Sequence, residues 1–426
     1  MALTTLLASF LFTTPSAAEG VTEILLTGDS VTQGSAGDWT WRYRLWQHLV
    51  TTAVPADFVG PRTDLYDYNL GVLGSYDYVD PGFDTHHAAV WASSFTSPVY
   101  DVADLVREYH PDVVVESLGL NDLAGYLATP QTVLAEAADY VAQARAADPE
   151  VDVVLTTLPQ TWIAGTVDYN AGLPTLASKL SSPASRVVVA TPPEPLLQFV
   201  DTWDPAHLSA TGEVKVAAGV ADALAALGVG SPYPRPLLEV ANGPRSRATL
   251  GVRTEGSAAA ELTWIDPPGA TGEYIWMRDV SVADSWKRVV GPVSDHAWHV
   301  AGLRQGHDYE FRLQAIKGTA VAEDMFSNTA GVTRPPPGIV SVRITSHRRG
   351  LRVRWWPTWK VPRGVRYRVR WWPKGHRSSV TSRKTSKSAL RIRGLRAGRA
   401  YRIVVRAWKA GVPGPRKRAL GVTRPR

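Results

Sequence analysis

The sequence predicts an α/β/α sandwich followed by two all-β sandwiches, and three observations support this fold class. Patterns typical of buried strands and of helices alternate over residues 21–230. Beyond this region the pattern changes to short strands separated by turns, spaced about 8–12 residues apart. This second half also repeats with a period of about 90 residues. A chain of 426 residues is too long for one hydrophobic core, so several domains are expected.

Four short apolar runs predict the strands of the first domain. They are Ile24–Leu26, Val113–Val115, Val153–Leu155 and Val187–Val189. Continuous apolar runs of this length are typical of strands that are buried on both faces of a parallel sheet. Because helical patterns lie between the runs, we expect helices to cover both faces of that sheet.

Three helices are predicted in the same region, over residues 39–50, 129–146 and 210–227. The second begins with Thr129 as its cap and Pro130 at the first helical position. The third follows Ser209. A Pro/Gly-rich segment at Gly228–Pro236 then predicts a linker to the all-β half.

The N-terminus has the features of a secretory signal peptide. Residues 1–18 carry no charge, Leu6–Phe12 is apolar and Ser16–Ala18 is a small-residue cleavage signal. We therefore expect a secreted or cell-surface protein whose residues 1–18 are removed. No later stretch offers the ~20 unbroken apolar residues of a transmembrane span. The chain has no Cys, which excludes disulfides, a thiolate nucleophile and Cys-ligated zinc.

Three short motifs carry the groups of a serine acyl-hydrolase. Gly28–Ser30 follows the first predicted strand, Gly119–Asp122 follows the second, and Asp204–His207 precedes the last predicted helix. Ligands of open α/β sheets bind at the carboxyl ends of the strands, so we expect the three motifs to meet at that edge.

The residue types in these motifs suggest their roles. We expect His207 to take the proton of the Ser30 hydroxyl and later to give a proton to the leaving oxygen. Asp204 would hold the other ring nitrogen and stabilise the imidazolium. The Asn121 side-chain amide and the Ser30 backbone N–H would stabilise the tetrahedral oxyanion.

These motifs resemble those of the SGNH hydrolase (GDSL-type esterase) family. Gly28–Gly34 fits its first block, Gly119–Asp122 its third and Asp204–His207 its fifth. The resemblance covers about residues 21–228 and implies a flavodoxin-like sandwich that uses no metal or other cofactor. We place the domain at residues 19–230. Asp29, Gly119 and Asp122 would support the reacting groups.

The second block of the family, which contributes a Gly to the oxyanion hole, has no clear counterpart. The candidates are Gly74, in Asn69–Gly74, and Ala92, in His87–Ala92. We favour Ala92 because it lies closer to the next predicted strand. A backbone N–H does not require Gly, so this departure does not exclude activity.

Two further groups of residues in the first domain have alternative interpretations. His86–His87 beside Asp84 could form a metal cluster, but the spacing matches no standard site and a polar active-site loop is the favoured interpretation. Three tryptophans near the first helix could line a substrate cleft, although helical spacing favours core packing for at least one of them. These tryptophans are Trp39, Trp41 and Trp46.

The second half of the chain resembles two fibronectin type III domains. Gly302–Tyr309 matches Gly394–Tyr401 at an offset of 92 residues. In that family an inward Trp lies on the second strand and a Leu precedes the Tyr of a tyrosine corner. Here these residues would be Trp264, Leu303 and Tyr309, and then Trp355, Leu395 and Tyr401. The predicted domains span 238–334 and 338–426, with Pro335–Pro337 as a stiff joint.

The last predicted domain is strongly basic. Residues 338–426 contain 27 Lys or Arg and no Asp or Glu, so all 39 acidic residues precede them. Strand alternation places arginines outside on both predicted sheets. They are Arg352, Arg354, Arg366, Arg368, Arg370, Arg391, Arg393, Arg402 and Arg406.

Such a surface predicts binding to an anionic polymer, either a cell-wall polymer or an acidic polysaccharide. Extracellular DNA and anionic lipid headgroups are further candidates. One alternative is a solvated basic face without a partner. Another is that the basic domain binds the acidic remainder of its own chain.

Together these features predict a secreted esterase that hydrolyses short-acyl or carbohydrate esters and is held near its polymer by the basic domain. A GDSL-type lipase or phospholipase is an alternative of the same class, but no long apolar lid is visible in the sequence. A catalytically silent cell-surface adhesion protein is an alternative of another class. The complete set of Ser30, Asn121, Asp204 and His207 disfavours it.

Overall fold

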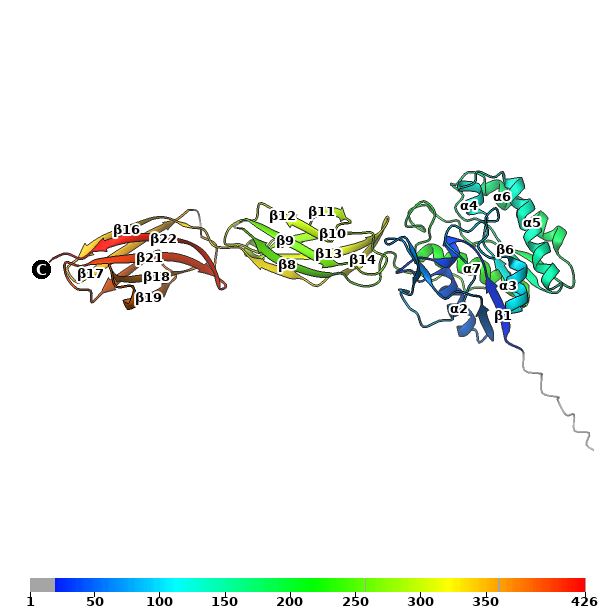
Figure 1. The fold of residues 1–426 in the computed structure, drawn as a ribbon, viewed down its shortest axis with the longest axis horizontal. Helices are drawn as coiled ribbons and strands as arrows, with labels where there is room; N and C mark the ends of the chain where they lie inside the picture. The colour runs from blue at the N-terminus through cyan, green and yellow to red at the C-terminus, as the bar shows by residue number, and fades with distance from the viewer. Residues whose placement is uncertain (1–19, 257, 359–360, 426) are drawn as a thin grey trace, which may run out of the picture. The chain divides into compact units, whose positions relative to one another are not determined.

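The computed structural model describes residues 20–256, 258–358 and 361–425, and the chain divides into two compact units, Met1–Asn242 and Gly243–Arg426 (Figure 1). The expected signal peptide, residues 1–18, lies outside the described residues. Within those residues, no helix is both long and apolar enough to cross a membrane.

The first unit is built on a five-stranded parallel sheet in the order β2-β1-β5-β6-β7, which is the flavodoxin-like order. The strands are β1 (Thr22–Leu26), β2 (Ala56–Val59), β5 (Val113–Glu116), β6 (Asp152–Thr156) and β7 (Val187–Ala190). All four predicted strands are present. The edge strand β2 was not predicted, because Asp57 interrupts its short apolar pattern.

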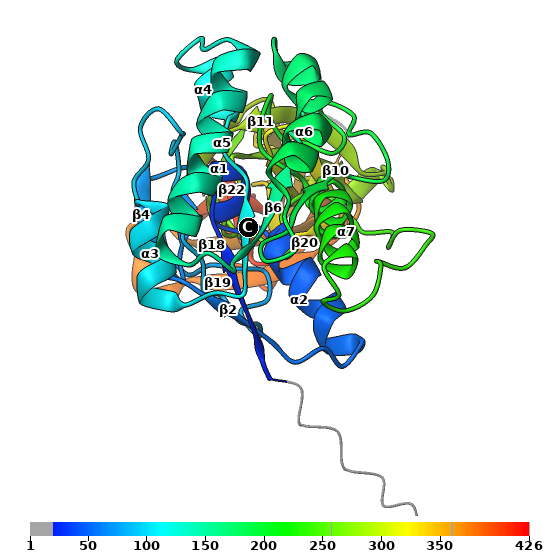
Figure 2. The ribbon, with the colours of Figure 1, turned by 90° about the vertical axis from the view of Figure 1, so that its right-hand side faces the viewer.

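Helices cover both faces of this sheet (Figure 2). They are α2 (Trp41–Thr51), α3 (Val102–Tyr109), α5 (Pro130–Ala147), α6 (Thr166–Leu180) and α7 (Ala210–Ala226). Ile24 and Leu26 of β1 pack in one core with α2 and α7, whereas Leu25 packs in another with α3 and α5. Alternate strand residues thus serve opposite faces, which explains the continuous apolar runs.

Three of these helices agree with the predictions to within a few residues. At the start of α5, the Thr129 side chain accepts a hydrogen bond of 3.2 Å from the Thr132 amide, as expected of its cap. Helices α3 and α6 were not predicted. The remaining short elements are α1 (Ser30–Gln33), α4 (Leu120–Ala124) and the hairpin of β3 (Leu65–Asp67) and β4 (Val72–Ser75).

The segment expected to be a linker packs against the first unit. The Tyr233 amide donates to Asp222 Oδ1 at 2.8 Å, and Asn242 Nδ2 donates to the Val200 carbonyl at 2.9 Å. These contacts extend the first unit to Asn242.

The second unit contains two antiparallel sandwiches with the same arrangement of strands. In the first, β12-β9-β8 pack against β11-β10-β13-β14, and β15 also pairs with β13. These strands are β8 (Thr249–Glu255), β9 (Ala259–Ile265), β10 (Gly272–Asp279), β11 (Lys287–Val293), β12 (Ala297–Val300), β13 (Asp308–Lys317), β14 (Ala320–Phe326) and β15 (Ala330–Thr333).

In the second sandwich, β16-β17-β20 pack against β19-β18-β21-β22. These strands are β16 (Ile339–His347), β17 (Gly350–Pro357), β18 (Arg366–Pro373), β19 (Thr381–Thr385), β20 (Ala389–Arg393), β21 (Ala400–Lys409) and β22 (Val412–Val422). Two single-turn 3₁₀ helices, Val280–Val282 and Arg377–Ser379, complete the unit.

The predicted landmarks of the repeat occur in both sandwiches. Trp264 and Trp355 are buried in the two cores. The Tyr309 hydroxyl accepts a hydrogen bond of 3.0 Å from the Arg304 amide, and the Tyr401 hydroxyl accepts one of 3.0 Å from the Arg396 amide. Each sandwich therefore contains a tyrosine corner.

Candidate active site

Ser30 lies just beyond the carboxyl end of β1, where the chain leaves the sheet and begins α1. Asp29 is the N-cap of that helix, and its Oδ1 accepts a hydrogen bond of 2.8 Å from the Val31 amide. Gly28 has a φ of 153°, and a Cβ at this position would lie 2.9 Å from the Ser117 carbonyl oxygen. Only glycine therefore fits the turn that delivers Ser30 from the sheet.

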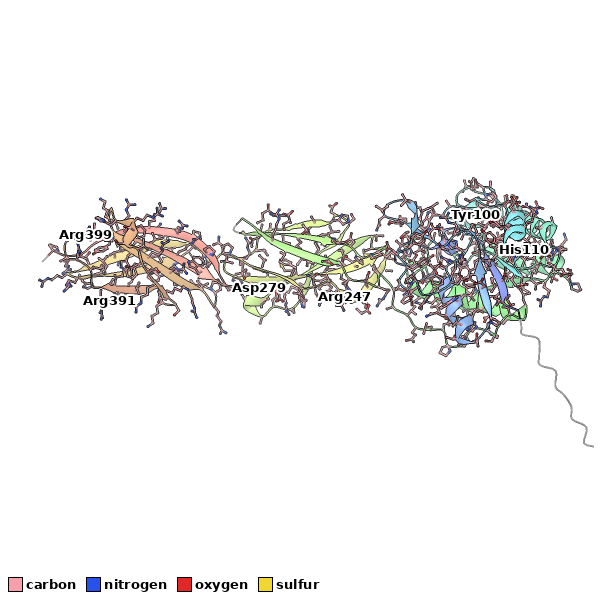
Figure 3. All side chains as sticks on the ribbon, turned by 60° about the horizontal axis from the view of Figure 1, so that its bottom comes forward. Tyr100, His110, Arg247, Asp279, Arg391 and Arg399 are labelled. Atoms are coloured by element: carbon pink, nitrogen blue, oxygen red, sulfur yellow. The ribbon has the colours of Figure 1, made fainter. Side chains whose placement is uncertain are left out.

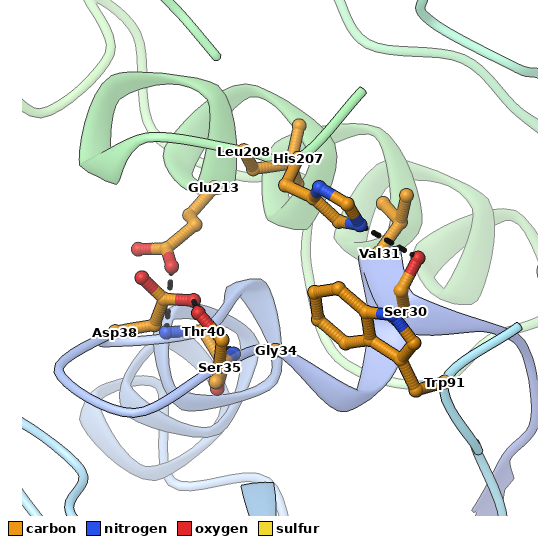
Figure 4. Close-up of a pocket in the computed structure, with 10 residues that line it drawn as sticks. All are labelled: Ser30, Val31, Gly34, Ser35, Asp38, Thr40, Trp91, His207, Leu208 and Glu213. Atoms are coloured by element: carbon orange, nitrogen blue, oxygen red, sulfur yellow. Dashed lines mark hydrogen bonds between the residues drawn. The ribbon is translucent and has the colours of Figure 1, made fainter. Parts of the chain in front are cut away.

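The His207 imidazole lies between Ser30 and Asp204. Its Nε2 is 3.0 Å from Ser30 Oγ, and its Nδ1 is 2.7 Å from Asp204 Oδ2. An ionised carboxylate only accepts hydrogen bonds, so Nδ1 carries the proton and Nε2 accepts from the serine hydroxyl. Figure 4 shows the hydroxyl and the ring facing each other. In this geometry the imidazole can remove the hydroxyl proton.

Asp204 is held by the backbone of its own motif. Its Oδ1 accepts hydrogen bonds from the Ala206 and His207 amides, at 2.8 and 2.7 Å. Burial acts to raise the pKa of Asp204, but the hydrogen bonds from the His207 ring and from these amides outweigh it and lower the pKa below its usual value. Asp204 is thus ionised at neutral pH and can stabilise an imidazolium.

Two side chains that follow β6 anchor the loop that carries His207. Gln160 Nε2 donates to the Ala206 carbonyl at 2.7 Å, and Trp162 Nε1 donates to the Pro205 carbonyl at 2.7 Å. Neither contact could be predicted from the sequence, because a single Gln or Trp outside a motif gives no signal of its partner.

Asn121 follows β5, the neighbour of β1, and lies in the first turn of α4. Its Nδ2 donates to the Ser93 carbonyl at 2.9 Å and to Asp29 Oδ2 at 3.3 Å. The amide therefore lies beside the N-cap of the helix that begins with Ser30. The longer of the two bonds, to Asp29, is the one that a substrate oxyanion could replace.

Ala92 lies between two residues of this site. Trp91 lines the same pocket as Ser30, and the Ser93 carbonyl binds Asn121. Ala92 has a φ of 65°, in the left-handed region that favours glycine. Its backbone conformation is thus the one expected where the family has a Gly.

Gly74, the other candidate for the second-block amide, has a different partner. It lies in β4, and its amide donates to Asp64 Oδ2 at 2.8 Å. Because this donor is already engaged, the geometry favours Ala92 over Gly74.

Side chains from two of the motifs hold the segment that contains Ala92. Gln33 Oε1 accepts from the Trp91 amide at 2.7 Å. The buried Asp122 carboxylate accepts from the Phe95 amide at 3.0 Å and from the Thr96 amide at 2.8 Å. The first and third motifs thus position the segment that contains Ala92.

Two carboxyl groups below the site have raised pKa values. Burial, with a further contribution from the Asp122 charge, raises the pKa of Asp29 to about 7. Burial raises the pKa of Glu116 to about 8, with Asp29 and Asp122 adding to the effect. Glu116 Oε1 accepts from the Leu118 amide, whereas its Oε2 has no hydrogen-bond partner among the described residues. No motif in the sequence identifies Glu116 as part of the site.

Aromatic rings surround the imidazole. Trp91 stacks on His207 with ring centroids 4.3 Å apart, and Trp203 stacks on it at 5.1 Å. Tyr66 stacks on Trp91 at 4.2 Å, and Tyr68 contacts Trp203 edge-on at 5.1 Å. These rings were not predicted as part of the site, because an aromatic residue in a sequence is equally compatible with a core.

A pocket extends from the serine and histidine to a polar end (Figure 4). Ser30, Trp91 and His207 line one side, and Asp38 and Glu213 lie on the other. Glu213 Oε1 accepts from the Thr40 amide at 2.9 Å, and Asp38 Oδ2 accepts from the Ser35 amide at 2.8 Å. Carboxyl groups therefore line the pocket at its far end.

The two adjacent histidines have separate partners. His86 Nδ1 is 2.8 Å from Asp84 Oδ1, whereas the buried His87 has its Nε2 2.9 Å from the Asp64 carbonyl oxygen. Burial lowers the pKa of His87 well below its usual value. Residues 20–256, 258–358 and 361–425 contain no group of three or more His, Cys, Asp or Glu that could hold a metal ion.

The three tryptophans near the first predicted helix lie outside the pocket lining. Trp41 is fully buried in the core between the sheet and helices α2 and α7, so the predicted core packing of at least one of the three tryptophans is confirmed. Trp39 and Trp46 are half-buried and contact Tyr43 and Phe83, respectively, with ring centroids 5.0 and 6.2 Å apart.

The nine arginines that the sequence predicts to be outside lie on strands of both sheets of the last domain, at positions that alternate with buried residues. Those on β17 and β20 are Arg352, Arg354, Arg391 and Arg393; those on β18 and β21 are Arg366, Arg368, Arg370, Arg402 and Arg406. Figure 3 labels Arg391 among the many side chains that cover this sandwich.

The chain contains the domain of a carboxylester hydrolase. Residues 26–215 match the GDSL-like Lipase/Acylhydrolase family, and residues 335–422 match the Fibronectin type III domain. The first match spans the motifs that contain Ser30, Asn121, Asp204 and His207.

Solved structures with similar folds include an acetyl esterase mutant with acetate ion, at 22% identity and a TM-score of 0.42, over 48% of this chain and 97% of that one. A carbohydrate esterase family 3 protein from Talaromyces cellulolyticus has the same values. A two-domain fibronectin type III segment of chicken tenascin has 18% identity and a TM-score of 0.33, over 41% of this chain and 97% of that one. No curated protein matches the chain.

Proposed function

We propose that the chain is a secreted serine esterase that hydrolyses short-acyl or carbohydrate esters. One observation carries this proposal: His207 Nε2 is 3.0 Å from Ser30 Oγ while His207 Nδ1 is 2.7 Å from Asp204 Oδ2. A hydroxyl becomes an effective nucleophile when an oriented base takes its proton, and this contact supplies that base.

In the first half of the reaction Ser30 Oγ attacks the ester carbonyl carbon while its proton passes to His207 Nε2. The imidazolium is stabilised by Asp204, whose lowered pKa keeps it ionised. The tetrahedral oxyanion would accept hydrogen bonds from the Ser30 and Ala92 amides and from Asn121 Nδ2. One such donor is worth roughly 3 kcal/mol of barrier lowering.

Collapse of this intermediate breaks the bond to the leaving oxygen, which takes the proton from His207 and departs as an alcohol. The acyl group remains on Ser30. A water molecule then attacks the acyl carbon as His207 removes its proton. Return of that proton to Ser30 Oγ releases the carboxylic acid and regenerates the site.

The lining of the pocket supports small or polar substrate groups. Asp38 and Glu213 lie beyond the reacting groups, and carboxyl groups suit hydroxyl groups better than an extended apolar chain. We therefore favour short-acyl or carbohydrate esters over long-chain lipids.

The basic last domain would hold the enzyme near an anionic polymer of a cell wall or of an acidic polysaccharide. The absence of Asp and Glu from residues 338–426 supports an electrostatic tether of this kind. Secretion is supported by the apolar, uncharged pattern of residues 1–18.

An acyl-length series tests the enzymatic part of this proposal. Purified full-length protein is assayed on p-nitrophenyl esters of increasing acyl length, together with Ser30→Ala and with Ser178→Ala, which removes an exposed hydroxyl of α6. We expect short esters to be preferred, Ser30→Ala to be inactive and Ser178→Ala to match the parent. No Ser30-dependent turnover at any acyl length would instead favour a silent adhesion protein, and a preference for long acyl groups would favour a lipase.

A further inference from the structure

One face of the last sandwich carries an ordered array of cations. It is the outer face of the sheet β19-β18-β21-β22. Tyr367 and Val369 of β18, and Ile403 and Val405 of β21, point into the core, so the residues between them point outward. Those outward positions hold most of the basic residues of the two central strands.

The strand register aligns these cations in a row across the sheet. Lys384 of β19 lies opposite Arg368 of β18, Arg368 lies opposite Arg406 of β21, and Arg406 lies opposite Arg416 of β22. Neighbouring strands are about 4.8 Å apart, so four cationic side chains follow one another at about that interval. Arg370 and Arg418 lie two residues beyond Arg368 and Arg416, on the same face, and Val404 of β21 lies between them.

Such a row opposes the stability of the sheet, because like charges directly opposite one another are destabilising. The first sandwich shows that the fold does not require it. There, Arg278 of β10 lies opposite Glu310 of β13 and forms an ion pair of 2.6 Å with it. The positions that match Arg368 and Arg406, relative to the tyrosine corner, hold Tyr274 and Gln314.

Two of the cations in the row are held in place. The guanidinium carbon of Arg368 lies 4.7 Å from the centroid of the Trp408 ring, and that of Arg406 lies 5.3 Å from it. Arg406 Nε also donates to the Gly414 carbonyl at 2.6 Å. Side chains that are already ordered lose less conformational entropy when they bind a partner.

The other sheet of the same sandwich lacks a comparable row. Arg343 lies opposite Arg354, whose other neighbour is Ala389, and Arg352 lies between Thr345 and Arg391. Its cations thus occur as adjacent pairs. Both sheets of this sandwich therefore carry positive charge, but only β19-β18-β21-β22 arranges its cations in a continuous row across all four strands.

We propose that the outer face of β19-β18-β21-β22 binds a linear acidic polysaccharide that lies across the strands along the row from Lys384 to Arg416. This inference rests on the proposed tethering function and assigns it a surface and a partner. The planar guanidinium of arginine can donate paired hydrogen bonds to two oxygens of a carboxylate or sulfate group of such polymers. Single-stranded nucleic acid is disfavoured along this row, since its bases need open aromatic rings to stack on, and the ring beside the row, Trp408, is covered by Arg368 and Arg406. Another outward tryptophan, Trp372 of β18, lies opposite Arg402 and outside the row.

The test compares two full-length variants that lose the same charge from different sheets. In the row variant Lys384, Arg368, Arg406 and Arg416 are each changed to Gln. In the matched variant Arg343, Arg352, Arg354 and Arg391 are each changed to Gln. Binding to polygalacturonate is measured at low and at physiological salt, with neutral dextran and single-stranded DNA as comparison polymers. Circular dichroism melting checks that each variant is folded.

We expect the row variant to lose roughly tenfold or more in affinity for polygalacturonate and most of its salt dependence, and the matched variant to stay within about threefold of the parent. Because Arg406 also bonds to Gly414, a second row variant spares it. That variant changes Lys384, Arg368 and Arg416 to Gln, and most of the same loss is expected.

Equal losses in the row and matched variants would overturn the inference, since net charge rather than this face would then govern binding. Tighter binding of single-stranded DNA than of polygalacturonate would overturn the choice of partner. If the parent protein binds none of the anionic polymers, the tethering part of the proposed function fails as well. The three outcomes therefore separate failure of this face, failure of this partner and failure of the proposed tethering function.

Discussion

The imidazole of His207 stacks on the indole of Trp91, with ring centroids 4.3 Å apart and planes 17° from parallel. Trp91 is itself fixed, because its amide donates to Gln33 Oε1 at 2.7 Å and Tyr66 stacks on its ring at 4.2 Å. The orientation of the proposed base therefore depends on aromatic packing as well as on Asp204.

We expect Trp91→Leu to lower kcat by about tenfold and to change KM little, because a ring contact is worth roughly 1 kcal/mol and its loss lets the imidazole rotate. Trp91→Phe should retain most of the activity. Steady-state kinetics on a short-acyl ester provide the measurement. Trp39→Leu is the control, since Trp39 is also half-buried but lies outside the pocket lining. An equal loss in this control would show that the effect is not specific to the stack.

We expect Asp204→Asn to lower kcat by roughly 10²–10⁴-fold, because an amide cannot stabilise the imidazolium and can hold the ring in the wrong tautomer. The two amides that bind Asp204 Oδ1 can still bind the Asn oxygen, so folding should survive. Asp104→Asn, which changes a highly exposed carboxylate, is the control. Unchanged kinetics in Asp204→Asn would remove Asp204 from the proposed mechanism.

We expect Asn121→Ala to lower kcat by about a hundredfold with little change in KM, because the amide would act on the oxyanion rather than on the bound ester. A rise in KM at constant kcat would assign Asn121 to ground-state binding instead.

The backbone of Ala92 gives a separate expectation. Ala92→Gly should keep the activity within about twofold, since the N–H remains and glycine adopts a φ of 65° without strain. Ala92→Val should lower both kcat and thermal stability, because a β-branched side chain is disfavoured in that conformation. Kinetics and melting curves of the two variants provide the comparison. A Val variant as active as the parent would argue against a fixed amide at this position.

Glu116 gives a pH-dependent expectation. Its pKa is about 8 in the folded protein and near 4.5 in an unfolded chain, so the native state binds the extra proton between these values. Its contribution to stability therefore falls as pH rises from about 4.5 to about 8, by up to about 5 kcal/mol in total. The Glu116→Gln variant should not lose this stability as pH rises, because its side-chain amide does not titrate.

The measurement is the temperature at which half of the esterase activity survives a heat treatment, applied at several pH values and assayed at a single pH. We expect Glu116→Gln to match the parent near pH 5 and to exceed it by several degrees at pH 8. Parallel curves for the two proteins would contradict the raised pKa.

Where side chains act locally, the sequence was sufficient to predict the structure. The apolar runs at β1, β5, β6 and β7 are short and continuous and alternate with helical patterns, which is typical of buried parallel strands. The Asp-x-x-His spacing of Asp204 and His207 suits a turn in which one carboxylate binds both backbone and ring. The repeated Leu and Tyr of the tyrosine corner were visible because two copies lie in one chain.

Where contacts join segments that are distant along the chain, the structure could not be predicted from the sequence. Strand β2 is short and contains Asp57, so it has no strand-like pattern of its own. Gln160 and Trp162 bind the loop of His207 through single hydrogen bonds across 46 and 43 residues of chain. Trp91 and Trp203 could not be distinguished from core residues, because their role depends on which ring they meet after folding.

Two side chains hold the segment around Ala92: Gln33 accepts a hydrogen bond from the Trp91 amide, and Asp122 accepts from the Phe95 and Thr96 amides. All three donors are backbone amides, which any residue except proline can supply. Apart from Ala92, whose left-handed backbone restricts its side chain, the segment can therefore accept many different side chains while its backbone stays in place. The segment is therefore hard to recognise from its own residues, whereas Gln33 and Asp122, which hold its backbone, mark its position in the fold.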